Sequence, residues 1–220
     1  MKLKKKSGLI SAVIALSCAS IVSVGFASWV ISQGDDETVQ GQILVDEVVD
    51  GSHVLTVDAT GVNPIAFKAN KLTAGKGWLT ADAVGENLSA VYNITVTNLS
   101  DAAKIHASLK AGHLESSSFV EDASSVGYGK ANSEGLVGAL PTPAIDVSAS
   151  GSNMVGTVTL TFTWGSHFSG SNPMDFYNAN EADDEISSGV SYASDASTQL
   201  NLLKNDLTGV YYQLLIEVDA

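Results

Sequence analysis

The side chains that could bind a metal ion are few and scattered. The four histidines are His53, His106, His113 and His167, and no two of them follow an HExxH pattern. His106 and His113 are seven residues apart, so on one extended strand they would face opposite sides. The spacing therefore indicates no zinc site, and we expect these histidines to be solvated or to lie on edge strands.

Two acidic clusters, Asp35–Glu37 and Asp183–Glu185, offer the hard oxygen ligands that calcium prefers. Neither cluster matches the spaced D-x-[DN]-x-[DN]-G loop, and contiguous acidic side chains point in different directions. We expect solvated loops and no cofactor, with calcium at the second cluster as the open alternative. Its candidate ligands are Asp175, Asp183, Asp184 and Glu185.

No catalytic motif is recognisable in the chain. Serine is abundant, but there is no G-x-S-x-G elbow. The segment 166–185 combines acidic residues with Phe168, Phe176 and Tyr177, whose rings could stack on sugars. Trp164 continues the apolar face of a predicted strand and belongs in the core. We expect no enzymatic activity.

The N-terminus has the pattern of a secretory signal peptide. Four lysines within the first six residues precede an apolar run that ends at the small residues Gly25 and Ala27. We expect cleavage after Ala27, which makes Ser28 the new N-terminus and residues 1–27 the signal. The alternative is cleavage before Cys18 and lipidation of that residue, although the preceding sequence lacks the usual branched residue.

Charge excludes one large class of function. Cleavage after Ala27 leaves seven lysines against 24 acidic residues, a formal charge of −17, and the chain has no arginine. Such a surface repels phosphate backbones, so we expect no nucleic-acid binding. With no cysteine beyond Cys18, a disulfide framework is excluded too. No later apolar run could span a bilayer, so membrane contact is expected only through the signal peptide.

From Thr38 onward the pattern is typical of β-strands: Val, Ile, Thr and aromatic residues alternate with polar residues between Gly, Asn, Asp and Ser. It predicts an all-β fold, an antiparallel sandwich of about nine strands in one domain over residues 39–220, preceded by a segment at 28–38. The predicted strands are Val39–Val48, His53–Asp58, Ile65–Ala69, Gly77–Ala81, Ser89–Asn98, Ala103–Lys110, Ile145–Ala149, Gly156–Trp164 and Val210–Asp219.

One short C-terminal helix is predicted at about residues 195–207. Ala196, Leu200, Leu203 and Leu207 recur with helical spacing, and Gly209 can end the helix. Ser194 or Asp195 can cap its start. The segments 115–133 and 166–189 are rich in Ser, Gly, Asn and acidic residues, and we expect both to be long surface loops.

Two stretches resemble the TasA and camelysin family of secreted bacterial surface and biofilm-matrix proteins. The first combines the lysine-rich head, the Gly25–Ala27 exit, Trp29, the acidic turn at Gly34–Asp36 and the strand Val39–Leu44; the second is Val91–Asn98. The resemblance implies a jelly-roll sandwich, export by a dedicated signal peptidase and assembly into extracellular fibres. Low lysine content and the C-terminal helix and strand depart from the family pattern.

The leading hypothesis is a secreted structural protein of a bacterial surface or extracellular matrix, which associates with itself or with another surface protein. After cleavage the chain begins with an apolar segment that includes Trp29, Val30 and Ile31. This segment either folds onto its own sandwich or adds as a strand to the next subunit. The alternative function is that of a carbohydrate-binding or adhesive module. A secreted metallopeptidase is a remote alternative.

Overall fold

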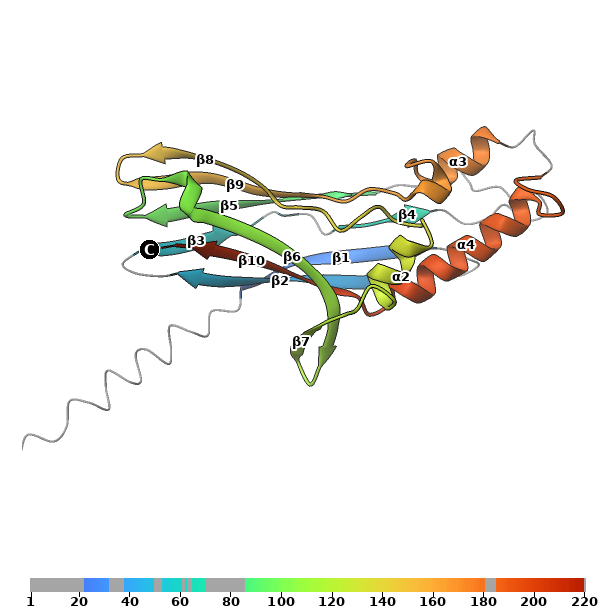
Figure 1. The fold of residues 1–220 in the computed structure, drawn as a ribbon, viewed down its shortest axis with the longest axis horizontal. Helices are drawn as coiled ribbons and strands as arrows, with labels where there is room; N and C mark the ends of the chain where they lie inside the picture. Colours follow the sequence, from blue (N-terminus) through green and yellow to red (C-terminus); the bar gives the residue numbers. More distant parts are fainter. Residues whose placement is uncertain are drawn as a thin grey trace, which may run out of the picture.

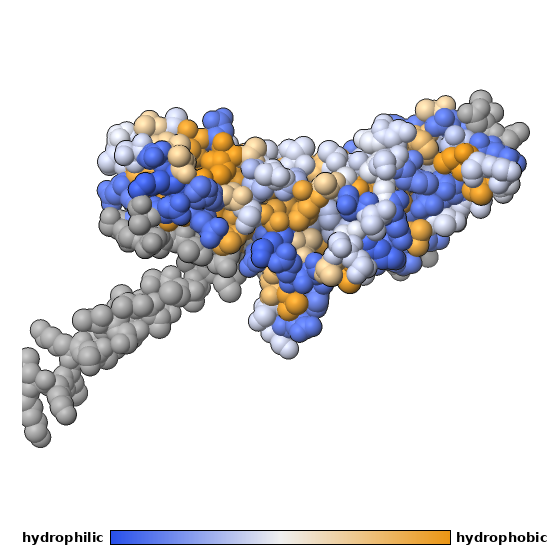
Figure 2. All heavy atoms as spheres, in the orientation of Figure 1, coloured by the Kyte–Doolittle hydropathy of each residue, from blue (hydrophilic) through white to orange (hydrophobic). Residues whose placement is uncertain are grey.

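The computed structural model describes residues 22–31, 38–49, 53–60, 62, 65–69, 86–180 and 185–219. Within these ranges the chain forms two β-sheets, and three α-helices gather at one end of them (Figure 1). The prediction of a mostly β, sandwich-like fold with few helices is confirmed. In the view of Figure 2, hydrophilic side chains cover much of the visible side of the long helix.

The larger sheet contains the N-terminal and C-terminal strands of the described chain, in the order β4-β1-β2-β10-β6-β7. The smaller sheet has the order β3-β5-β9-β8. The strands of the larger sheet are β1 (Val22–Ile31), β2 (Thr38–Val49), β4 (Lys68–Ala69), β6 (Ile105–Glu115), β7 (Ser118–Glu121) and β10 (Tyr211–Val218). Those of the smaller sheet are β3 (Val54–Asp58), β5 (Ser89–Thr97), β8 (Ala144–Ser150) and β9 (Asn153–Thr161).

Neighbouring strands are antiparallel, apart from two parallel pairs in the larger sheet. β10 runs parallel to β2, from Tyr212 opposite Ile43 to Val218 opposite Val49, and β1 runs parallel to β4. A parallel pair needs a long crossover, and here most of the chain lies between β2 and β10. On its other side β10 pairs with β6, so this C-terminal strand has a partner on both edges.

The period-two pattern predicted the buried faces of two strands correctly. In β9 and the residues after it, Val158, Leu160, Phe162 and Trp164 are all buried, and Thr161 is exposed. β10 alternates in the same way from Tyr211 to Val218. Antiparallel sheets with one solvated face show this alternation. β9 ends at Thr161, and Trp164 continues only as an isolated bridge to Val137.

The C-terminal helix is confirmed as α4 (Tyr192–Leu207), which begins three residues before the predicted start. Its four predicted apolar residues are fully buried. The cap is Ser191, whose hydroxyl accepts from the Ser194 backbone N–H at 3.2 Å. Thr208 follows the helix, and Gly209 adopts a left-handed conformation with φ of 77°.

The two predicted surface loops contain regular structure. The first contains β7 and α2 (Gly127–Ser133), and the second contains the 3-10 turn η2 (Ser166–Phe168) and α3 (Pro173–Ala179). These helices are seven residues long, too short to show an apolar period. A further 3-10 turn, η1, spans Ala102–Lys104.

The predicted count of about nine strands is not confirmed. The predicted strand at Gly77–Ala81 lies outside the described residues. The pattern did not predict β7, and it placed most of β1 in the signal peptide. Strand β1 extends across the expected cleavage point between Ala27 and Ser28.

Aromatic rings join the two sheets in the core. Phe162, directly after β9, meets Tyr212 of β10 with ring centroids 5.1 Å apart. The Phe162 ring also lies 6.0 Å from Phe67 and 6.1 Å from Tyr128 of α2. Edge-to-face geometry of this kind adds about 0.5–1.5 kcal/mol per pair beyond the buried area.

The first prediction compares the two neighbouring residues Phe162 and Thr161. Phe162→Ala should lower the free energy of unfolding by about 3–5 kcal/mol, because it opens a cavity where three other rings meet. Thr161→Ala should cost far less, because that side chain is exposed. Urea denaturation measures both, and equal losses would show that the burial pattern is not the one described.

Candidate functional site

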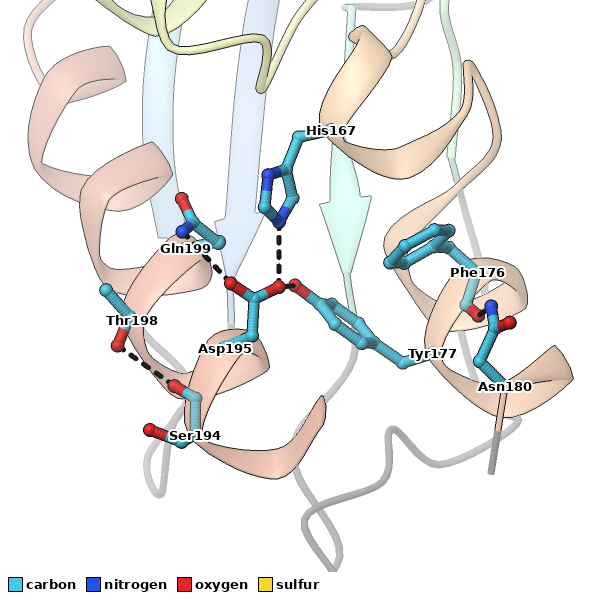
Figure 3. Close-up of polar contacts among 8 residues, drawn as sticks. All are labelled: His167, Phe176, Tyr177, Asn180, Ser194, Asp195, Thr198 and Gln199. Carbon is cyan, nitrogen blue, oxygen red and sulfur yellow. Dashed lines mark hydrogen bonds and ion pairs between the residues drawn. The ribbon is translucent and has the colours of Figure 1, made fainter. Parts of the chain in front are cut away.

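Among the described residues outside the sheets, the carboxylate of Asp195 makes hydrogen-bond contacts with three other side chains (Figure 3). His167 Nε2 lies 2.7 Å from Asp195 Oδ2, and the Tyr177 hydroxyl donates to the same oxygen at 2.7 Å. The Gln199 side-chain amide donates to Oδ1 at 3.1 Å. The Asp195 residue is only 6% exposed, so its carboxylate is held by three side chains with little help from water.

Three separate elements bring these side chains together. Asp195 is in the first turn of α4, where a negative charge is stabilised by the helix dipole. His167 comes from η2 and Tyr177 from α3. The Tyr177 ring is fully buried between Phe168, at a centroid distance of 6.0 Å, and Phe176, at 5.1 Å. Aromatic packing therefore fixes the position from which Tyr177 donates.

A cavity of about 630 Å³ opens beside this network. Polar side chains of α4 form one wall, and the turn before α4 contributes apolar side chains. The lining residues are His167, Ile186, Ser187, Val190, Ser194, Asp195, Thr198 and Gln199. A hollow of this size is within the range of small-molecule sites, and its hydroxyl and amide groups suit a polar, hydroxyl-bearing ligand.

The geometry differs from that of a catalytic Ser-His-Asp triad. In such a triad the aspartate binds Nδ1 and leaves Nε2 for the nucleophile, whereas here Asp195 binds Nε2 of His167. Both Asp195 oxygens already accept hydrogen bonds. Burial, followed by the bond to Asp195, raises the pKa of the Tyr177 hydroxyl, so Tyr177 remains a donor at ordinary pH. The arrangement acts as a polar clamp that holds η2, α3 and α4 together.

A second polar cluster joins α2 to α4. Lys130 Nζ lies 2.6 Å from Asp206 Oδ1 and 3.7 Å from Glu134 Oε1. The hydrogen bond from Lys130 to Asp206 raises the pKa of the ammonium group. Asp206 is 8% exposed, and its Oδ2 is buried without a hydrogen-bond partner among the described residues. The Lys130 side chain is partly exposed, so it is the buried Asp206 carboxylate that would be left uncompensated if the pair were broken.

His113 and Asp122 line the cavity of about 490 Å³ next to this cluster. His113 Nδ1 lies 2.6 Å from Asp122 Oδ1, and Nε2 lies 3.3 Å from Glu115 Oε1. These contacts, that with Asp122 first, raise the pKa of the His113 imidazole. His113 belongs to β6 and Asp122 directly follows β7. Protonation of the His113 imidazole therefore strengthens the contact that holds these two strands together.

The predicted calcium ligands are not shown as a site. Asp175 is exposed in the first turn of α3, and Glu185 is exposed and accepts from the Gly189 backbone N–H at 3.2 Å. Asp183 and Asp184 lie outside the described residues. Among the described residues, no group of three or more His, Cys, Asp or Glu side chains is placed to hold a metal ion.

The aromatic residues proposed for sugar stacking are mostly internal. Phe168 and Tyr177 are fully buried, and Phe176 is half-buried against them. Trp164 is buried as predicted, and its indole N–H donates to Glu86 at 2.6 Å. The segment 166–180 therefore uses these rings to hold its own helix, which the surrounding polar composition did not indicate.

Residues near the expected cleavage site lie in β1. Gly25, Ala27 and Ser28 belong to this strand, as do Trp29, Val30 and Ile31 of the predicted assembly segment. The backbone pairs with β2 from Val22 opposite Val45 to Val30 opposite Thr38. Beyond this pairing, Val30 and Ile31 also pair with Lys68 and Ala69 of β4. Cys18 and the acidic cluster at 35–37 lie outside the described residues.

Sequence reasoning did not find the Asp195 network. It considered Asp195 only as a helix cap and His167 only as a solvated or edge-strand histidine. The two residues are 28 positions apart, and no spacing rule connects a 3-10 turn to a helix that follows a long segment. The apolar period of α4 and the Phe-Tyr pair at 176–177 were the only signals that this region is packed.

Comparison with known proteins adds no relative. No family model, curated protein or solved structure matches the chain. Within the part of the chain that the structure describes, no helix has the length and apolar character needed to cross a membrane.

The second prediction tests the polar clamp. Asp195→Ala should lower the free energy of unfolding by about 2–4 kcal/mol, because it leaves the buried Tyr177 hydroxyl without an acceptor. The matched control is Asp175→Ala, which removes an exposed aspartate from the first turn of α3 and should cost less than about 1 kcal/mol. Similar losses in urea denaturation would contradict the clamp.

The third prediction concerns the titration of His113. Because the folded-state pKa is raised above 6.5, this pair stabilises the fold below about pH 6.5 and loses that contribution as pH rises through the folded-state pKa. NMR titration of the imidazole should give a midpoint above 6.5, and Asp122→Asn should lower it. Glu121→Gln is the control, because Glu121 binds Lys110 at 2.7 Å. A midpoint unaffected by Asp122→Asn would refute the assignment.

Proposed function

We propose that the protein is a secreted structural component of a bacterial surface or extracellular matrix, and that its subunits join by strand addition at β1. The observation that supports this most is the place of β1 between β2 and β4 in the larger sheet. The expected cleavage point lies within this strand. Export would therefore remove part of a strand that pairs with a neighbouring strand on each of its two sides.

The strand pairing defines what such a cut would open. The residues Val22, Ser23, Phe26 and Ala27 pair with Val45, Leu44, Gln42 and Gly41 of β2. Without them, Leu44 and Val45 keep β10 on one side and expose unpaired backbone groups on the other. An exposed ladder is a template for another chain. The segment that begins at Ser28 is a strand of matching character, and a neighbouring copy that releases it from its own β2 and β4 can supply the missing strand.

The proposal includes the resemblance to the TasA and camelysin family and its jelly-roll sandwich. Two sheets with a packed aromatic interior are compatible with that topology. The absence of cysteine after Cys18 fits a matrix protein that relies on packing and strand pairing. A charge of −17 keeps separate subunits apart in solution, so assembly would require specific contacts. We propose no catalytic role.

The second candidate function is binding of a glycan. The cavity beside Asp195 favours it, because Ser194, Thr198 and Gln199 present hydroxyl and amide groups to a space of about 630 Å³. The buried Phe168 and Tyr177 rings weigh against sugar stacking. Binding to a glycan array, lost on Gln199→Ala, would favour this function over the structural one.

The fourth prediction tests assembly directly. The exported protein, with its N-terminus checked by intact mass, should form fibres in electron microscopy. Trp29→Asp should abolish them, because a charge in a short β-forming segment opposes strand pairing. Val126→Asp is the matched control, an exposed apolar residue before α2 that should leave fibres unchanged. Exported wild-type protein that stays monomeric at high concentration, with calcium and at acidic pH, would refute the proposal.

A further inference from the structure

The outward face of the smaller sheet is built almost entirely from small, uncharged side chains. Strand registers place residues from all four strands side by side on this face. We call it the threonine face, because Thr is its commonest residue. Its side chains are Val54, Thr56, Asp58, Ser89, Val91, Asn93, Thr95, Thr97, Ala144, Asp146, Ser148, Ser150, Asn153, Val155, Thr157, Thr159 and Thr161.

Exposed apolar residues gather on this face. Four large hydrophobic side chains are exposed among the described residues, and three of them, Val54, Val91 and Val155, belong to the threonine face. Their exposed fractions are 56%, 44% and 39%. Val155 lies opposite Thr95, and Val54 lies opposite Thr97. The methyl groups of these threonines extend the apolar area around the valines.

Charge is nearly absent from the same area. The threonine face carries only two charged residues, Asp58 on β3 and Asp146 on β8, which are the outer strands of the sheet. The whole chain has a formal charge of −13. Two copies that approach through this face therefore meet less like-charge repulsion than they would through a surface with the average charge of the chain.

The area is large enough for a weak, specific contact. The four strands are five, nine, nine and seven residues long, and with about 3.4 Å per residue and about 4.8 Å between strands they give a face of roughly 490 Å². Pairing two such faces would bury on the order of 1,000 Å² in total. This value is in the range of weak, transient protein contacts.

We propose that the threonine face is a docking surface for a second copy of this chain, which stacks on it face to face. Two β-branched surfaces interdigitate well when sheets stack, and a two-fold arrangement needs only this one self-complementary patch. The contact is independent of strand addition at β1, because it uses the other sheet and side chains in place of backbone groups.

The test measures the dimer dissociation constant by sedimentation across a concentration series. The double variant Val91→Glu/Val155→Glu should raise this constant at least tenfold, because it places four extra carboxylates in a paired interface. The control Ser125→Glu/Val126→Glu adds the same two carboxylates per chain at exposed residues outside the sheets and should change the constant less than threefold. Higher salt should tighten the wild-type dimer by screening the aspartates.

A second variant separates face pairing from strand addition. Trp29→Asp should abolish fibres while leaving the threonine-face dimer intact, whereas the double valine variant should leave single fibres and remove the dimer. Thr157→Cys, with Cys18 absent after export, should form a disulfide-linked dimer, because Thr157 lies on a central strand of the face. Ser125→Cys is its exposed counterpart outside the sheets and should cross-link much less.

Three outcomes would overturn the proposal. The first is a wild-type protein that shows no dimer at millimolar concentration, and the second is a dimer that survives the double valine variant. The third is an equal effect of the control Ser125→Glu/Val126→Glu, which would make the loss a consequence of net charge alone. In the first case, binding of a neutral glycan by the threonine face would assign this surface to a different partner. Near-UV circular dichroism confirms that each variant is folded.

Discussion

The structure depends on the contact between its two sheets, where Phe162 meets Tyr212. No cysteine beyond Cys18 is present to cross-link the sheets, so the fold rests on burial of apolar area, worth about 25 cal/mol for each Å². Tyr128 extends this contact to α2, because its ring meets both Phe162 and Tyr212. One aromatic cluster thereby connects both sheets and the helical end, and the polar clamps at Asp195 and Asp206 can form only on this frame.

The period-two pattern of β9 and β10 was sufficient to predict a sandwich with the correct buried faces, because a half-buried strand must alternate. The spacing of leucines in α4 predicted a helix for the same reason. The sequence could not predict that β10 pairs with β2 across most of the chain length. Such pairing depends on tertiary structure, because the sequence pattern of a strand does not specify which distant strand lies beside it.

The candidate site was harder to predict from the sequence than the fold was. The sequence predicts Asp195 as one of two candidate helix caps, but the cap is Ser191. The partners of Asp195, His167 and Tyr177, lie in short elements without a readable period. The sequence predicts a surface loop at 166–189, because the segment is rich in Gly, Asn and acidic residues. Its few rings nevertheless bury enough area to order α3, and this order brings the histidine and tyrosine onto one carboxylate.

The two proposed contact surfaces point in different directions, and this difference has a physical consequence. Strand addition at β1 would extend the larger sheet through backbone hydrogen bonds, while the threonine face would join copies through side chains on the smaller sheet. A chain with a formal charge of −13, or −17 after the expected removal of residues 1–27, gains little from unspecific association, so each contact must be specific enough to overcome repulsion. Backbone pairing supplies that specificity through register, because each N–H must meet a carbonyl group of the partner strand. Side-chain stacking has no such register, so the threonine face would give the weaker of the two contacts, and screening of the shared negative charge by salt would strengthen both.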